Sequence, residues 1–174
     1  MLRKLALMAC VALLAFAAPA LAAKAPTVTS ISRLADLHTP LPFPFDENVD
    51  ADKSVDAALA LAKQQHKRVF IDLGGNWCAD CRMLTGLMDL PEVKAFVDAH
   101  YVVVNVDVGR SNRNLQIPAR WAAIKALKND GAPTVLIVDP GTNTLVDEGH
   151  TGALEDARHM DPQSIVNWIA QWAS

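Results

Sequence analysis

The sequence predicts one α/β domain with a central mixed sheet of about four strands, flanking helices and an extended N-terminal segment. Three observations support this prediction. The 174 residues are 51% apolar and 20% charged, which is enough for one packed core. Short apolar runs alternate with stretches of helical periodicity, and a turn and a further strand-like segment follow the third run. Strands separated by helices are expected to pair in parallel, and the final hairpin adds an antiparallel edge.

The N-terminal part precedes this domain. Residues 24–53 lack helical periodicity and contain four prolines: Pro26, Pro40, Pro42 and Pro44. We expect this segment to be extended, and either to cover the domain surface or to serve as a tether. Phe43 and Phe45 are its candidates for docking on the core. The α/β domain then occupies residues 54–174.

The elements of the domain follow from hydrophobic periodicity. The expected strands are residues 69–73, 101–108, 134–138 and, at the edge, 144–148. The expected helices are residues 54–65 with Ser54 as N-cap, a helix that starts at Cys78, then 92–100, 118–129 and a last helix after Asp161 and Pro162.

Residues 1–23 have the layout of a secretory signal peptide. Arg3 and Lys4 precede an apolar run at residues 5–18, and small residues follow, with cleavage expected near Ala22 or Ala23. The run is short for a membrane span, although a retained N-terminal anchor is an alternative. A lipoprotein interpretation based on Cys10 is disfavoured because the apolar run continues beyond it. We therefore expect an exported protein.

Charge excludes several classes of partner. Loss of Arg3 and Lys4 with the leader changes the formal net charge from −3 to −5. A mildly acidic protein has no electrostatic footprint for nucleic acid or for anionic membranes. We expect a monomer with no membrane span after leader cleavage, and we expect no cofactor and no resident metal ion.

Cys78 and Cys81 are the two cysteines outside the leader, and they lie where a strand passes into a helix. The N-terminus of a helix stabilises a thiolate, and this spacing allows the two sulfurs to form a disulfide. Such a small loop would add little stability, so a redox role explains the spacing better. Asp72 lies in the preceding apolar strand. It either faces outward or is buried with a raised pKa beneath the cysteines.

These motifs resemble the thioredoxin superfamily. The run from residue 69 to Cys81 combines a strand, Trp-Cys-x-x-Cys and a helix, and the residues 131–134 (Gly-Ala-Pro-Thr) precede the third strand. The resemblance covers residues 54–172 and implies the thioredoxin fold. With the leader, it implies an exported, periplasmic thiol:disulfide oxidoreductase that acts on disulfide-containing client proteins and is supplied by an upstream thiol electron donor.

The resemblance also implies roles for individual residues. Cys78 would be the nucleophile that attacks a client disulfide, and Cys81 would resolve the mixed disulfide. Asp72 would move the proton of Cys81. Pro133 would be preceded by a cis peptide bond, would shape the groove and would prevent metal capture.

Four further residues would contact the client. Trp77 would shield the site, and the backbone of Ala132 would pair with an extended client strand. Gly152 and Ala153 fall where the family lines its groove.

The dipeptide between the cysteines, Ala79-Asp80, differs from the Gly-Pro of thioredoxin. Gly74-Gly75 replaces a bulkier pair, and Val103 stands where many thioredoxins have a lysine near the buried acid. The Asp80 carboxylate would disfavour the thiolate and so favour a reductant, whereas Arg82 and the helix dipole oppose it.

Alternatives remain at this point. The same chemistry would serve an oxidase or an isomerase. The two sulfurs, with Met83, Met88 or His150 nearby, could instead hold copper in a metallochaperone. A structural binding domain with an inert disulfide is the third alternative.

Overall fold

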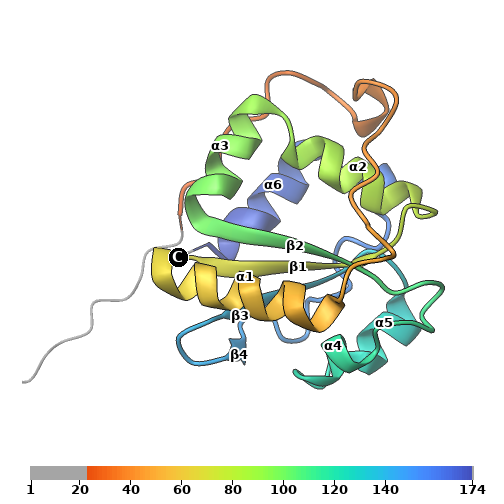
Figure 1. The fold of residues 1–174 in the computed structure, drawn as a ribbon. Helices are drawn as coiled ribbons and strands as arrows, with labels where there is room; N and C mark the ends of the chain where they lie inside the picture. Colours follow the sequence, from red (N-terminus) through yellow and green to blue (C-terminus); the bar gives the residue numbers. More distant parts are fainter. Residues whose placement is uncertain (1–22, 174) are drawn as a thin grey trace, which may run out of the picture.

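The computed structural model describes residues 23–173 (Figure 1). The predicted leader lies almost wholly outside these residues. In chain order, the elements are the 3₁₀ helix η1 (Leu34–Asp36), α1 (Ala51–Gln65), β1 (Arg68–Gly74), α2 (Ala79–Met88), α3 (Pro91–His100), β2 (Tyr101–Asp107), α4 (Gln116–Ala119), α5 (Ile124–Asp130), β3 (Thr134–Asp139), β4 (Thr144–Leu145), the 3₁₀ helix η2 (Ala157–His159) and α6 (Pro162–Gln171).

The four strands form one mixed sheet in the order β2-β1-β3-β4, which confirms the predicted sheet. β1 pairs with β2 in parallel, as expected. The prediction that all strands separated by helices run parallel is wrong for β3, because β3 pairs antiparallel with β1. β4 pairs antiparallel with β3.

The connection between β2 and β3 explains the antiparallel pairing. β2 ends at Asp107, which pairs with Gly74, and β3 begins at Thr134, which pairs with Leu73. Both ends of the connection therefore lie at the carboxyl end of β1. α4 and α5 are too short to carry the chain back along the sheet, and Figure 1 shows them beside that end. β3 must consequently run in the opposite direction to β1.

Helices cover both faces of the sheet. α2, α3 and α6 pack on one face, where Phe70 of β1 contacts a cluster that includes Leu84, Val97 and Ile169. α1, α4 and α5 pack on the other face against Val69, Ile71 and Leu73. Because side chains of a strand alternate between faces, Asp72 and Gly74 project with Phe70 toward α2.

Three element boundaries differ from the prediction. α1 begins three residues before Ser54, because the Asp50 carboxylate accepts the Lys53 N–H and is the N-cap. The helix expected at 118–129 is two short helices, separated where Ala122 has a φ of 57°. The edge strand stops at Leu145, because the Asp147 carboxylate takes the Ile137 N–H at 2.9 Å in place of a backbone carbonyl.

The N-terminal segment lies on the domain rather than apart from it (Figure 1). Leu37 and Leu41 lie against Gly86 of α2, and Phe45 is only 2% exposed. Glu92, at the start of α3, accepts hydrogen bonds from the backbone N–H groups of Thr29 and Ser30. Backbone donors, including its own N–H, lower the pKa of Glu92 to about 2. Within residues 23–173, no helix has the length and apolar character needed to cross a membrane.

Candidate active site

Cys78 and Cys81 lie at the N-terminus of α2, just beyond the carboxyl end of β1. They are joined by a disulfide, with their Cα atoms 5.4 Å apart. Cys78 is the N-cap residue, and its sulfur accepts the backbone N–H of Cys81 at 3.1 Å. This N–H and the positive end of the helix dipole would stabilise a thiolate at Cys78 after reduction. Cys78 is 4% exposed and Cys81 is fully buried.

Gly74 allows Cys81 to approach the end of β1. A Cβ at this position would lie 2.6 Å from the Cys81 sulfur and 2.9 Å from the ring of Phe45. Any other side chain would therefore displace the sulfur or the ring. Phe45, Cys78 and Cys81 form a small buried cluster, with Ala132 at its border.

Asp72 lies two residues before Gly74 and on the same face of β1, so it lies on the side of the sheet that carries Cys81. It is fully buried, and neither carboxylate oxygen has a hydrogen-bond partner within residues 23–173. Burial raises the pKa of Asp72 to about 8. The acid thus combines two properties, which are loss of solvation and a position on the same side of the sheet as the buried cysteine.

Asn105 is the neighbour of Asp72 on β2, and its side-chain oxygen is also buried without a partner among the described residues. Asn105 and Val103 line a cavity of about 160 Å³ between α2, α3 and β2, with Thr85 on α2. The sequence carried no signal that Asn105 would lie opposite Asp72, because the register of β1 against β2 cannot be read from either strand alone.

Ala132 and Pro133 lie across from Cys78. The Cys78 sulfur is 3.4 Å from the carbonyl oxygen of Ala132, and the Ala132–Pro133 peptide bond is cis. The start of β3 therefore borders the outer cysteine. Gly152 and Ala153 follow Thr151, whose carbonyl accepts the Val135 N–H at 2.9 Å, so they lie near the same end of β3.

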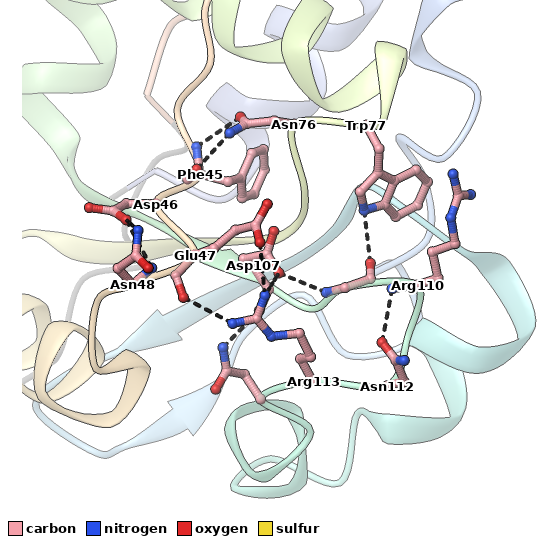
Figure 2. A network of polar contacts seen from close by, with 12 residues as sticks. Phe45, Asp46, Glu47, Asn48, Asn76, Trp77, Asp107, Arg110, Asn112 and Arg113 are labelled. Atoms are coloured by element: carbon pink, nitrogen blue, oxygen red, sulfur yellow. Dashed lines mark hydrogen bonds and ion pairs between the residues drawn. The ribbon is translucent and has the colours of Figure 1, made fainter.

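Trp77 lies next to the cysteines and is 46% exposed. Its indole N–H donates to the carbonyl of Gly109 at 2.9 Å, and the Arg110 guanidinium lies 4.8 Å from the ring centroid (Figure 2). The loop after β2 therefore supports the exposed indole from one side. A Cβ at Gly75 would collide with this indole, which accounts for the second glycine of the motif.

The same network fastens the N-terminal segment to the site (Figure 2). The Asn76 side chain accepts the Phe45 N–H at 3.1 Å and donates to the Phe45 carbonyl at 2.6 Å. Arg113 bridges Glu47 at 3.1 Å and the buried Asp107 at 3.5 Å. Two residues of the segment thus have polar partners in the loops that flank the cysteines.

Asp80 differs from its predicted surroundings. It is 3% exposed, and both carboxylate oxygens accept hydrogen bonds from Arg158 of η2. The prediction set Arg82 and the helix dipole against the negative charge of Asp80, but Arg82 donates to the backbone carbonyls of Pro42 and Leu41. Arg158, which lies 78 residues later in the chain, supplies the counter-charge. Ala79, the other residue between the cysteines, is exposed.

Neither methionine of the copper alternative belongs to the small cluster around the sulfurs. Met88 is buried among the apolar side chains of the core, Met83 packs against that core, and the ring centroid of His150 lies 5.4 Å from that of Trp172. Within the part of the chain that the structure describes, no group of three or more His, Cys, Asp or Glu side chains is placed to hold a metal ion.

Comparison with known proteins gives the family. A family model described as thioredoxin-like matches residues 50–140, which is more than half of the chain. The chain belongs to the thioredoxin-like family. This confirms the resemblance that the sequence indicated. The match begins at the N-cap of α1 and includes the cysteines and the cis proline.

Two relatives of this thioredoxin-like protein have names that refer to disulfide chemistry. The solved structure of a disulphide isomerase from Xylella fastidiosa is 34% identical, with a TM-score of 0.67, over 75% of this chain and 96% of that one. The thiol:disulfide interchange protein DsbD 1 of Pseudomonas aeruginosa is 29% identical over 112 residues, which are 64% of this chain and 18% of that protein. The chain thus spans about a fifth of that relative. The fold, the family and the Cys78–Cys81 pair together identify a thiol:disulfide oxidoreductase.

Proposed function

We propose that this protein reduces disulfides in client proteins of the cell envelope through its Cys78–Cys81 pair. One observation supports this most strongly. The Cys78 sulfur lies at the N-terminus of α2, while a buried acid with a pKa raised to about 8 lies on the Cys81 side of the sheet. Cys78 is therefore placed to act as the nucleophile, and Asp72 is placed on the side of the sheet where Cys81 would need a proton acceptor.

The proposed reaction proceeds in two exchanges. The Cys78 thiolate attacks one sulfur of a client disulfide, so that a mixed disulfide forms and the first client sulfur leaves as a thiolate and takes a proton. Cys81 then loses its proton to the ionised form of Asp72, which a pKa of about 8 leaves as the minor form at neutral pH, and attacks the Cys78 sulfur. The Cys78–Cys81 disulfide forms, and the second client thiolate is released. The client gains two electrons, and an upstream thiol donor must return two electrons to the protein.

The pKa of Asp72 suits this role. A general base works best when its pKa is near that of the group it deprotonates and near the working pH. A pKa of about 8 is close to that of an ordinary thiol, about 8.5. Proton transfer between Cys81 and Asp72 would then cost little in either direction.

The direction of electron flow depends on how strongly the thiolate is stabilised. Ala79 is apolar, and the charge of Asp80 is balanced by Arg158, so the dipeptide adds no net positive charge at the sulfurs. Strong oxidants of this kind depend on a highly stabilised thiolate. We therefore propose a reduction potential nearer to roughly −270 mV than to roughly −120 mV.

Turbidity from insulin reduction, with dithiothreitol as donor, tests the activity. Wild type is expected to accelerate the reaction, and Cys78→Ser is expected to behave as the reaction without protein. Equal rates for the two proteins would contradict the catalytic role. Equilibration with glutathione tests the direction, because a potential above about −150 mV would exclude a reductase. Cys81→Ser should accumulate mixed disulfides with clients, and their identification would name the partners.

Two parts of the proposal rest on other observations. Export rests on the leader at residues 1–23, and N-terminal sequencing of the mature protein should begin near residue 23 or 24. Disulfide isomerisation is a second candidate, because the structural relative from Xylella fastidiosa carries that name. Reactivation of a protein with scrambled disulfides, without net reduction, would favour the isomerase.

A further inference from the structure

The ion pair between Asp80 and Arg158 has no part in the exchanges described above. Asp80 is the second residue of α2 and lies between the two cysteines in sequence, with its carboxylate directed to η2. The Arg158 backbone N–H donates to Oδ1 at 2.8 Å, and its Nε lies 3.0 Å from both carboxylate oxygens. Its Nη2 donates to Oδ2 as well. The guanidinium thus holds the carboxylate through both of its oxygens.

A buried carboxylate beside two cysteines has an electrostatic consequence. Negative charge near a thiol disfavours the thiolate and raises the pKa of the thiol. A cation bound directly to that carboxylate cancels most of this effect, since the thiol then faces a nearly neutral pair. The Asp80 carboxylate in turn raises the pKa of Arg158, so this residue remains a cation.

We propose that Arg158 is a positioning residue for the redox couple, which fixes the Asp80 carboxylate on η2 and cancels its charge beside Cys78 and Cys81. This inference rests on the proposed function, since it requires the two cysteines to cycle between dithiol and disulfide. It assigns to η2 a direct influence on how readily Cys78 exists as a thiolate.

The other charged groups around the cysteines have their own partners or lie elsewhere. Arg82 donates to the backbone carbonyls of Pro42 and Leu41, and Arg110 lies over the Trp77 ring. The Asp107 carboxylate accepts the Gly109 N–H and contacts Arg113.

Two acids remain to be considered. Asp72 lies on β1 beneath the pair, and its raised pKa keeps it protonated at neutral pH. Asp156, the N-cap residue of η2, contacts the ring of His159. Arg158 is therefore the cation whose removal would leave a carboxylate within the cysteine motif without its counter-charge.

Exchange with glutathione measures the couple directly. Two glutathione thiols reduce the Cys78–Cys81 disulfide, and one glutathione disulfide and the protein dithiol are formed. The Cys78 thiol then releases its proton to solvent according to its pKa. The pH dependence of alkylation of the reduced protein by iodoacetamide reports this pKa, because only the thiolate reacts.

Four variants test the inference, and two of them are expected to shift the thiol pKa in opposite directions. Arg158→Gln should raise the thiol pKa by about one unit and lower the equilibrium constant for reduction by glutathione about tenfold, which is about 30 mV. Asp80→Asn should lower the pKa and raise the constant. The double variant should return close to wild type. Arg158→Lys keeps the charge and should show less than half of the Arg158→Gln shift.

A purely structural role would give a different pattern. His159→Gln changes the adjacent exposed residue of η2 and should leave the pKa and the equilibrium constant unchanged. Shifts of the same sign in Arg158→Gln and Asp80→Asn, or no shift in either, would overturn the inference. If Arg158→Gln does not fold, Asp80→Asn and Arg158→Lys decide it in the same way. A wild-type protein that does not exchange with glutathione would instead overturn the proposed function, and this inference with it.

Discussion

The surroundings of two buried carboxylates near the cysteines, Asp72 and Asp80, differ in one respect. Both are nearly inaccessible to solvent. Asp72 has no hydrogen-bond partner within residues 23–173, so burial raises its pKa to about 8 and it keeps a proton. Both carboxylate oxygens of Asp80 are bound by Arg158. The two acids are therefore similarly buried, and they differ in whether a cationic partner binds the carboxylate.

The largest expected effect is on the pH dependence of stability. It is measured by urea unfolding of wild type and Asp72→Asn at several pH values. Below pH 3.8, the ordinary pKa of an aspartate, Asp72 is protonated in both states; between 3.8 and about 8, the unfolded chain loses a proton that the folded protein keeps. The wild type should therefore lose stability as pH rises through this range, by at most about 1.4 kcal/mol per pH unit. The loss should level off above pH 8.

At pH 8, Asp72→Asn should consequently be more stable than wild type by roughly 2–5 kcal/mol, and the advantage should vanish near pH 4. Asp80→Asn is the matched control. This variant loses an ion pair, and it should show no such growing stability advantage over wild type as pH rises. A wild-type profile that is flat between pH 4 and pH 8 would show that Asp72 does not retain its proton.

A second buried acid away from the cysteines sharpens the comparison. Burial raises the pKa of Asp147 to about 7, although its bond from the Ile137 N–H acts in the opposite direction. Asp147→Asn should therefore remove a smaller part of the pH dependence, between pH 4 and pH 7. The potential and the insulin activity should stay at wild-type values. A change in either would mean that an effect of Asp72→Asn on activity cannot be separated from a general effect of buried acids.

Gly74 is the last residue of the strand that carries Asp72, and it lies against the Cys81 side chain. A methyl group at position 74 should disturb this contact. Gly74→Ala places a Cβ 2.6 Å from the Cys81 sulfur, so it should destabilise the oxidised protein by about 1–3 kcal/mol in thermal or urea unfolding. Gly86→Ala is the matched control in α2, because its closest contact would be 3.3 Å, to the end of the Leu37 side chain. Equal costs for the two variants would argue against a close contact at Gly74.

The smallest effect is expected at Ala79, the exposed residue between the cysteines. Ala79→Ser should change the free energy of unfolding by less than about 0.5 kcal/mol. The glutathione equilibrium constant should change by less than about twofold, since a neutral exposed hydroxyl adds no charge. A tenfold change would mean that Asp80 and its partner are not the main electrostatic determinant within the motif.

The features that sequence could predict are local. The strand, the acid Asp72, the cysteines and the helix start all lie between residues 68 and 81, so periodicity and spacing predict their arrangement. The mixed sheet and most helices follow from the same periodicity. The cis peptide bond before Pro133 was expected only through the resemblance to thioredoxins.

The features that sequence missed depend on contacts between distant residues. Arg158 reaches Asp80 across 78 positions, and Asn76 binds the backbone of Phe45 across 31. The antiparallel direction of β3 depends on where the chain leaves and re-enters the sheet, which the helical pattern at 118–129 did not reveal. The break at Ala122, with its positive φ, has no glycine to mark it.

The central claim is that Asp72, and not Asp80, takes the proton of Cys81. The direct measurement is the rate at which Cys81 releases glutathione from a mixed disulfide on Cys78, followed from pH 5 to pH 10. Wild type and Asp80→Asn should show a rise with an apparent pKa near 8, which belongs to the coupled pair of Asp72 and Cys81. Asp72→Asn should lose this rise and resolve at least about tenfold more slowly at pH 8. An unchanged rise in Asp72→Asn, or its loss in Asp80→Asn, would contradict the account.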